Sequence, residues 1–265
     1  MKLAKILLYL VLAGFGGVSL VQAQTHFNIG AQVGIPVGDF RENTDAVGFG
    51  VKAGLFFPFA PNVPVFFGLD FGYMVYGSNT QFINENLLIQ ASNGLILGNI
   101  PINLRVRTNN NLFNGHAVLR IKAPLATVQP YVDGLVGFNY LTTRTKVFDE
   151  TQPCLFCDDP DGSNVINAST QEQSFVLSYG GALGMQIKLG ETVSLDVRGI
   201  YLLGGEAEYY DRSQTQDWTI SFTGTGIFNP NNPNPEDLDL NAPDAAPKRS
   251  KTDLFLATVG LTFNF

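Results

Sequence analysis

Hydrophobic and polar residues alternate with a period of two along eight separate stretches of this chain. The stretches are 27–35, 49–57, 67–75, 113–121, 132–140, 177–189, 193–197 and 255–265, with 132–140 the least regular. A period of two places successive side chains on opposite faces of a β-strand. The pattern therefore predicts eight strands, each with one apolar face and one small or polar face.

The last stretch, "LFLATVGLTFNF", keeps this alternation up to the final residue, Phe265. The ends of a soluble domain are usually polar and poorly ordered. A strand of about 9–11 residues is long enough to cross a bilayer at a tilt. We therefore interpret this ending as the closing strand of a membrane barrel, with Phe265 at an aromatic rim.

The faces of the predicted strands differ in character. The polar faces combine glycine with charged or titratable residues, namely Lys52, Asp70, His116, Arg120, Lys122, Asp133, Lys188, Asp196 and Arg198. The lumen of an eight-stranded barrel has room for little beyond such side chains, and opposite charges can pair there. The bulky apolar faces suit lipid, and a sheet in hydrocarbon must close on itself. We predict an all-β fold, a closed eight-stranded antiparallel up-and-down transmembrane barrel whose lumen holds a network of these charged residues.

The connections between the stretches alternate between short and long. Segments 58–64, 124–129 and 190–192 are short, whereas 38–48, 77–111, 142–174 and 205–253 are longer. Short periplasmic turns and long extracellular loops are typical of bacterial outer-membrane barrels. A soluble lipocalin-like barrel, the alternative fold, has no reason to alternate in this way. We expect both termini of the barrel in the periplasm.

The N-terminal residues resemble an export signal. Lys2 and Lys5 precede the apolar run "ILLYLVLAGFGGVSL", and small residues precede a cleavage position after Ala23. We predict a cleaved signal peptide at 1–23 and a barrel at 24–265; an uncleaved anchor is the alternative. The formal net charge of −7 argues against nucleic-acid binding.

With eight alternating strands, a signal peptide and the ending "GLTFNF", the chain resembles the small outer-membrane β-barrel proteins of Bacteroidota. That group includes PorT-like members and shares its barrel with OmpX and the OmpA transmembrane domain. The resemblance implies that Phe263 and Phe265 form a signal read by the barrel-assembly machinery. It also implies contact with outer-membrane lipid, and in PorT-like proteins a part in a secretion apparatus. Unlike OmpA, the chain shows no peptidoglycan-binding domain after the barrel.

The third long segment contains the pair Cys154 and Cys157. Such a pair can be redox-active, can contribute half of a zinc site with Asp158 or Asp159, or can form a local disulfide. In an exported chain we favour the disulfide. The adjacent "DDPDGSN" lacks the residue order of a calcium loop, which favours a solvated acidic loop. We expect no cofactor and no metal.

Two long segments contain further strand signals. An Asn93-Gly94 turn stands between apolar runs within 77–111, and Trp218, Ile220 and Phe222 alternate with polar residues in the last long segment. Both suggest strands that continue beyond the barrel as ribbons. Their edges could recruit a partner by strand addition, but we favour pairing of the strands with each other.

Function follows less directly from the sequence. A lipid-modifying barrel enzyme would need a serine near His116, and we expect none on the same face, so a packing role for His116 is favoured. The main hypothesis is a non-enzymatic barrel that supports the membrane or presents long acidic extracellular loops to partners. The alternative is a PorT-like secretion component with an envelope protein as partner.

Overall fold

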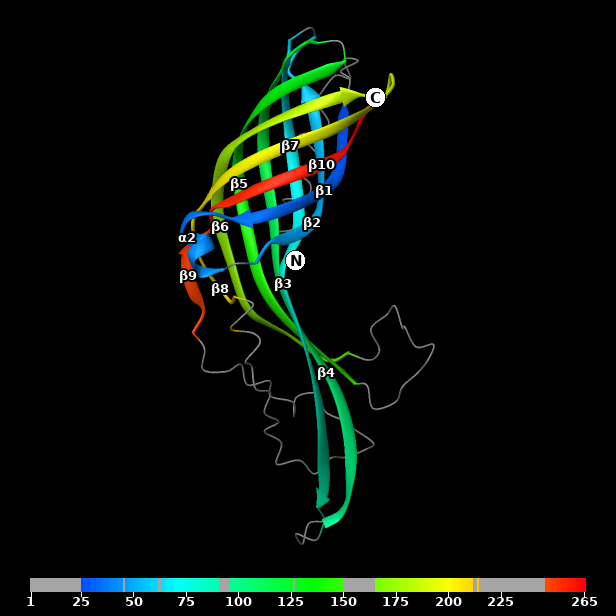
Figure 1. Cartoon of the computed structure of the whole chain (residues 1–265), viewed down its shortest axis with the longest axis vertical. Coiled ribbons are helices and arrows are strands. Elements are labelled where there is room, and N and C mark those ends of the chain that lie inside the picture. The colour runs from blue at the N-terminus through cyan, green and yellow to red at the C-terminus, as the bar shows by residue number, and fades with distance from the viewer. Residues whose placement is uncertain are drawn as a thin grey trace, which may run out of the picture.

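The computed structural model describes residues 25–44, 46–61, 63–90, 96–125, 127–149, 165–211, 214 and 246–265, and it contains a closed antiparallel barrel of eight strands (Figure 1). The strands are β1 (His26–Pro36), β2 (Gly48–Pro58), β3 (Val65–Gln90), β4 (Ile96–Lys122), β5 (Val128–Asp149), β6 (Val165–Lys188), β7 (Val193–Gly204) and β10 (Leu254–Asn264). Each strand pairs with its neighbours along the chain, and β1 closes the ring against β10. The predicted eight-stranded closed barrel is confirmed. The predicted signal peptide lies outside the described residues.

The two ends of the barrel differ. At one end, which we call the turn end, short segments join β2 to β3, β4 to β5 and β6 to β7, and the chain terminates there at Phe265. Figure 1 shows this end beside the label C. The opposite end, the loop end, carries the long connections from β5 to β6 and from β7 to β10 and the eleven-residue connection from β1 to β2. The fourth connection there departs from the alternation read from the sequence, because only residues 91–95 separate β3 from β4.

Four strands continue well beyond the barrel at the loop end. β2 follows β3 only as far as the pair Phe49 and Val75, whereas β3 and β4 stay paired as far as Gln90 and Ile96. β5 and β6 likewise stay paired as far as Phe148 and Val165. We call residues 76–90, 96–111, 142–149 and 165–177 the projecting sheet.

The projecting sheet corrects the expectation that 77–111 and 142–174 are mainly loops. The ribbon predicted within 77–111 is present, where β3 pairs with β4. The sequence did not predict the similar extension of β5 and β6 within 142–174. The predicted Asn93-Gly94 turn and the Trp218 segment lie outside the described residues. Polar residues occupy both faces of much of this sheet, so its sequence does not alternate in polarity.

A small cap, which the sequence did not predict, covers the loop end of the barrel. It consists of the six-residue helix α2 (Gly38–Asn43) and a two-stranded sheet of β8 (Glu206–Tyr209) and β9 (Lys248–Lys251). Gly38 begins the helix with a φ of 54°, a value that few other residues adopt. Lys248 Nζ donates to the Asn43 carbonyl at 2.7 Å and so fastens β9 to the helix end.

An apolar layer lies beneath the cap, inside the barrel. It is formed by the buried side chains of Met74, Leu112, Leu141, Ile200, Leu202, Leu254 and Leu256. Phe40 of α2 packs edge-on against Tyr209, with ring centroids 5.0 Å apart, and against Tyr76 at 6.2 Å. The lumen is thus apolar at the loop end, whereas the sequence indicated polar filling alone.

The exterior of the barrel carries the large apolar side chains. On β6, the side chain of Leu183 is 70% exposed and that of Leu177 is 74% exposed. Outward-facing residues on the other strands include Ile29, Phe49, Val51, Phe67, Leu119, Val136, Tyr201 and Val259. The predicted orientation, with bulk outward and charge inward, is therefore observed. No helix among the described residues is long and apolar enough to cross a membrane.

Candidate functional site

The turn-end half of the lumen contains a chain of alternating charges. Lys52 Nζ lies 3.3 Å from Asp70 Oδ2, and Asp70 is also bonded by Arg198. Arg198 Nη2 lies 2.7 Å from Asp133 Oδ2, without the alignment of a hydrogen bond. These residues come from β2, β3, β7 and β5, so the chain of charges crosses the interior.

Arg120 continues this chain from Asp133 to a third carboxylate. Its Nε and Nη2 donate to the two oxygens of Asp133 at 2.8 Å and 2.9 Å, a bidentate pairing that fits the planar guanidinium. Its Nη1 lies 3.7 Å from Asp196 Oδ2. Three cations thus face three anions, and all six residues are buried. We call Lys52, Asp70, Arg120, Asp133, Asp196 and Arg198 the ionic cluster.

Uncharged residues complete the ionic cluster. Tyr131 donates to Asp196 Oδ1 at 2.7 Å, and Gln186 Nε2 donates to Asp196 Oδ2 at 2.9 Å. The guanidinium of Arg120 lies between two rings, 3.7 Å from the centroid of Tyr131 and 4.1 Å from that of Phe56. Sequence reasoning missed these partners. The alternation along each strand shows that these side chains face the lumen. Which of them contact the ionic cluster depends on the register between strands.

The structure places the other predicted lumen residues differently. Lys122 is half-buried near the turn end and donates to Gln186 Oε1 at 3.3 Å. Lys188 is exposed at the last position of β6, at the rim of the barrel, and it takes no part in the ionic cluster. Four side-chain carbons allow a lysine at a barrel rim to reach water from an inward-facing position.

His116 lies in the lumen beside a serine, which corrects the expectation that none is near. Its Nε2 is 2.6 Å from Ser178 Oγ. In the register, His116 is opposite Gly137 and Gly137 is opposite Ser178. Since Gly137 has no side chain, the two groups meet across it.

This His-Ser pair lacks the access that catalysis needs. Ser178 is 1% exposed and His116 is 4% exposed. Ser178 Oγ also donates to Asn139 Oδ1 at 3.3 Å. A nucleophile must reach its substrate, and these atoms are enclosed by the barrel wall. The arrangement fits a buried polar pair.

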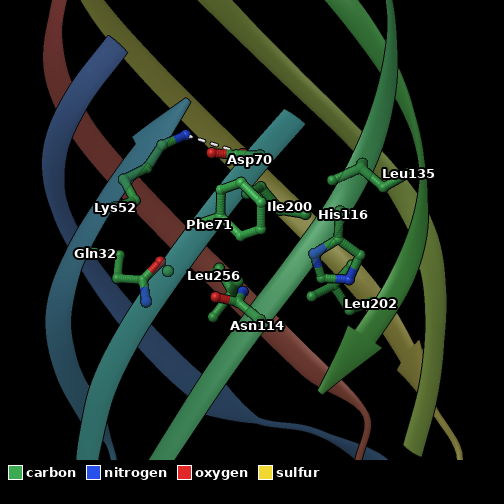
Figure 2. A pocket seen from close by; sticks show the side chains of 11 residues that line it. Gln32, Lys52, Asp70, Phe71, Asn114, His116, Leu135, Ile200, Leu202 and Leu256 are labelled. Carbon is green, nitrogen blue, oxygen red and sulfur yellow. Dashed lines mark hydrogen bonds and ion pairs between the residues drawn. The ribbon is translucent and has the colours of Figure 1, made fainter. Parts of the chain in front are cut away.

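A small cavity of about 10 Å³ separates the ionic cluster from the apolar layer. Figure 2 shows Gln32, Lys52, Asp70, Asn114 and His116 around it. Gln32 Nε2 and Asn114 Oδ1 are buried there and have no hydrogen-bond partner within the described part of the chain. A space of this size accommodates about one water molecule, which these groups could bind.

Aromatic residues form two adjoining rows on the outer surface. In one row Tyr73, Phe113, Tyr140 and Phe175 lie opposite one another on β3 to β6. Phe71 and Phe138 belong to the neighbouring row, and Phe138 stacks on Phe175 with centroids 4.9 Å apart. We call these six residues the aromatic band.

The aromatic band has a polar margin on the side of the loop end. Tyr73 donates to Asn111 Oδ1 at 2.8 Å, and Tyr140 donates to Gln173 Oε1 at 3.0 Å. Both acceptors stand two residues beyond the aromatic rows on the same outward face. The band therefore separates an apolar zone from a polar one.

The remaining predicted residues have the following places. Phe263 is opposite Phe27 in the register, with ring centroids 6.4 Å apart, and Phe265 is 77% exposed at the turn end. Cys154 and Cys157 lie outside the described residues, so their disulfide stays a prediction. Among the residues described, no three His, Cys, Asp or Glu side chains are grouped to hold a metal ion.

Compared by sequence, the chain matches no protein-family model and no curated protein. Among solved structures, Ail, the attachment invasion locus protein of Yersinia pestis, is 12% identical with a TM-score of 0.39, covering 92% of this chain and 99% of Ail. Neisserial surface protein A is 11% identical with a TM-score of 0.42, covering 91% and 97%. The outer membrane protease OmpT of Escherichia coli is 10% identical with a TM-score of 0.35, covering 94% and 99%.

Proposed function

We propose that this protein is a non-enzymatic outer-membrane barrel that presents the projecting sheet at the cell surface. The observation that carries the proposal is the inverted distribution of polarity in a closed barrel. Large apolar side chains face outward, and charged groups are paired inside. In water such a surface would be a liability for aggregation, whereas lipid would cover it.

The dimensions of the apolar zone support the same proposal. β1, β2 and β10 are each 11 residues long, which suits a tilted crossing of the hydrocarbon core. The aromatic band, with its tyrosine hydroxyls directed to polar acceptors, fits one boundary of that core. In this orientation the turn end, with Phe263 and Phe265, faces the periplasm, and the projecting sheet extends into the extracellular space.

The interior argues for support or display in preference to transport or catalysis. The ionic cluster and the apolar layer fill the lumen in succession, and His116 and Ser178 are enclosed. The projecting sheet is then the part available to envelope or external partners. The resemblance to PorT-like proteins makes a secretion apparatus one setting for such a partner.

Single cysteines at outward and inward positions of the same strand test the membrane proposal. Leu183 faces outward on β6, and Gln186 is buried in the lumen. With L183C and Q186C each introduced into the C154S/C157S chain and refolded in liposomes, we expect a lipid-soluble maleimide to label L183C at least about tenfold faster, because only that position contacts lipid. Equal labelling, or a purified chain that is soluble without detergent, would overturn the proposal.

A further inference from the structure

A basic cluster lies on the outward face of the projecting sheet, beyond the aromatic band. It consists of Arg105 and Arg107 on β4 and Arg144 and Lys146 on β5. These positions share the outward parity of Phe113 and Tyr140, since the β4–β5 register has no bulge between the two sets. Arg107 and Arg144 are exposed, and Arg105 and Lys146 are half-buried.

Like charges in this cluster are direct neighbours. Arg107 is the register partner of Lys146, and Asn109 is the partner of Arg144. Side chains of directly opposed residues are about 4.5–5.5 Å apart at Cβ, where like charges destabilise a sheet. The pairing of Arg107 with Lys146 therefore favours a bound anion.

The described residues supply no such anion. Neither Arg107, Arg144 nor Lys146 forms an ion pair with another described residue. The register partners on the flanking strands are uncharged, namely Thr80 and Phe82 on β3 and Ala168 and Thr170 on β6. Glu172 is opposite the buried Thr143, which places it on the other face of the sheet. The guanidinium of Arg105 lies 4.6 Å from the ring centroid of Phe148, which holds this side chain along the surface.

The height of the cluster indicates the kind of anion. Arg144 and Lys146 stand four and six residues beyond Tyr140, or about 13 Å and 20 Å along the strand. With the usual tilt of barrel strands this is roughly 10–15 Å above the band. Phospholipid headgroups extend only about 5–8 Å beyond the hydrocarbon. A lipid whose phosphates are carried on sugars reaches higher.

We propose that the basic cluster binds the phosphorylated saccharide headgroup of a glycolipid in the outer leaflet. This inference rests on the proposed function, because only a chain embedded up to the aromatic band holds the cluster at that height. Arg107 and Arg144 would contact phosphate oxygens through their planar guanidinium groups, and Lys146 would supply a third positive charge. The band below would contact the acyl chains of the same lipid.

The test measures the binding of fluorescent lipopolysaccharide to the full chain in detergent micelles by anisotropy. The variant R107Q/R144Q/K146Q should bind about 100-fold more weakly, given the usual contribution of each basic residue near an anionic lipid surface. The control K188Q/R249Q/K251Q removes the same charge from exposed positions outside the cluster and should stay within about twofold of the wild type. Dephosphorylated lipopolysaccharide should bind the wild type as weakly as it binds the cluster variant.

Three results would overturn the inference. The first is that the cluster variant binds lipopolysaccharide as tightly as the wild type does. The second is that the wild type binds dephosphorylated lipopolysaccharide as tightly as the phosphorylated form. The third is that the three substitutions weaken binding to nanodiscs of phosphatidylglycerol as much as they weaken binding to lipopolysaccharide. The last would assign the cluster to phospholipid headgroups. Labelling of L183C by the lipid-soluble maleimide is measured in parallel, with L183C introduced into C154S/C157S versions of the wild-type chain and of the cluster variant. If L183C labels and the cluster variant still binds, only the inference fails; if L183C does not label, the proposed function fails.

Discussion

At the scale of single residues, Arg198 holds two of the three carboxylates of the ionic cluster. It bonds Asp70 on one side and approaches Asp133 on the other. A buried charge is tolerated only with its partners, so the loss of one cation affects more than one pair. Removal of the Arg198 side chain therefore disturbs two ion pairs of the cluster at once.

We predict that Arg198→Ala lowers the free energy of unfolding by about 3–5 kcal/mol, because Asp70 and Asp133 then lack their shared cation. Unfolding in urea of detergent-refolded protein measures this. Lys188→Ala is the matched control and should change the value by less than about 0.5 kcal/mol, since Lys188 is exposed. Similar losses for both variants would contradict the view that the buried cluster stabilises the barrel.

The parity of each strand was enough to place most charged residues inside the barrel. It was not enough to place Ser178 beside His116, because that contact depends on the register of three strands and on Gly137 between them. Parity also did not indicate that Lys188 is exposed, because a flexible side chain at a strand end reaches water from the lumen face. Residue neighbours across a sheet are thus the information that alternation lacks.

At the scale of elements, the alternating period predicted all eight barrel strands. It failed where both faces of a strand meet a polar environment. Within 108–111 and 142–145, Thr and Asn face both ways, and Thr108 bonds Thr145 at 3.0 Å on the inner side. The period-two signal reports a difference between two faces and vanishes when there is none. The cap was missed because its helix has only six residues.

The closing strand β10 gives a prediction at this scale. Deleting Phe265 should reduce the amount of barrel inserted in cells and leave the stability of refolded barrels nearly unchanged. Phe265 is 77% exposed, so its loss removes only part of the roughly 1.5–3 kcal/mol that full burial of such a side chain contributes. Membrane fractionation measures insertion, and urea unfolding measures stability.

Phe59→Ala provides the control, because Phe59 is 76% exposed at the same end but lies outside the closing strand. It should insert normally if the assembly machinery reads the terminal aromatic residues. Normal insertion of the truncated chain together with weakened refolded barrels would show that Phe265 acts on stability instead.

At the scale of the whole molecule, two layers of side chains occupy successive parts of the lumen along the barrel axis. The ionic cluster occupies the turn-end half, and the apolar layer with its cap occupies the loop-end half. An eight-stranded barrel is just wide enough for such filling. Among the described residues, the cavity between the two halves is about the size of a single water molecule.

We expect no large, stable conductance from the wild-type protein in planar bilayers. Phe40→Ala, which removes the cap ring above the apolar layer, should also remain closed because the ionic cluster is untouched. Single-channel recording is the measurement, with a porin in the same bilayers as the positive control. Stable steps from the wild type would show that the packed lumen opens.

The ionic cluster and the apolar layer have different chemistry, so different substitutions would be needed to open each of them into a conducting nanopore. A charge inversion in the ionic cluster leaves the apolar layer intact, and the apolar layer excludes hydrated ions. A polar substitution in the apolar layer leaves the paired charges of the ionic cluster in place. Leakage therefore demands at least two unrelated changes in one gene copy. If the barrel lies in the outer membrane as proposed, the cell keeps its permeability barrier through most single mutations in this protein. A conducting variant would then require redesign of both halves together.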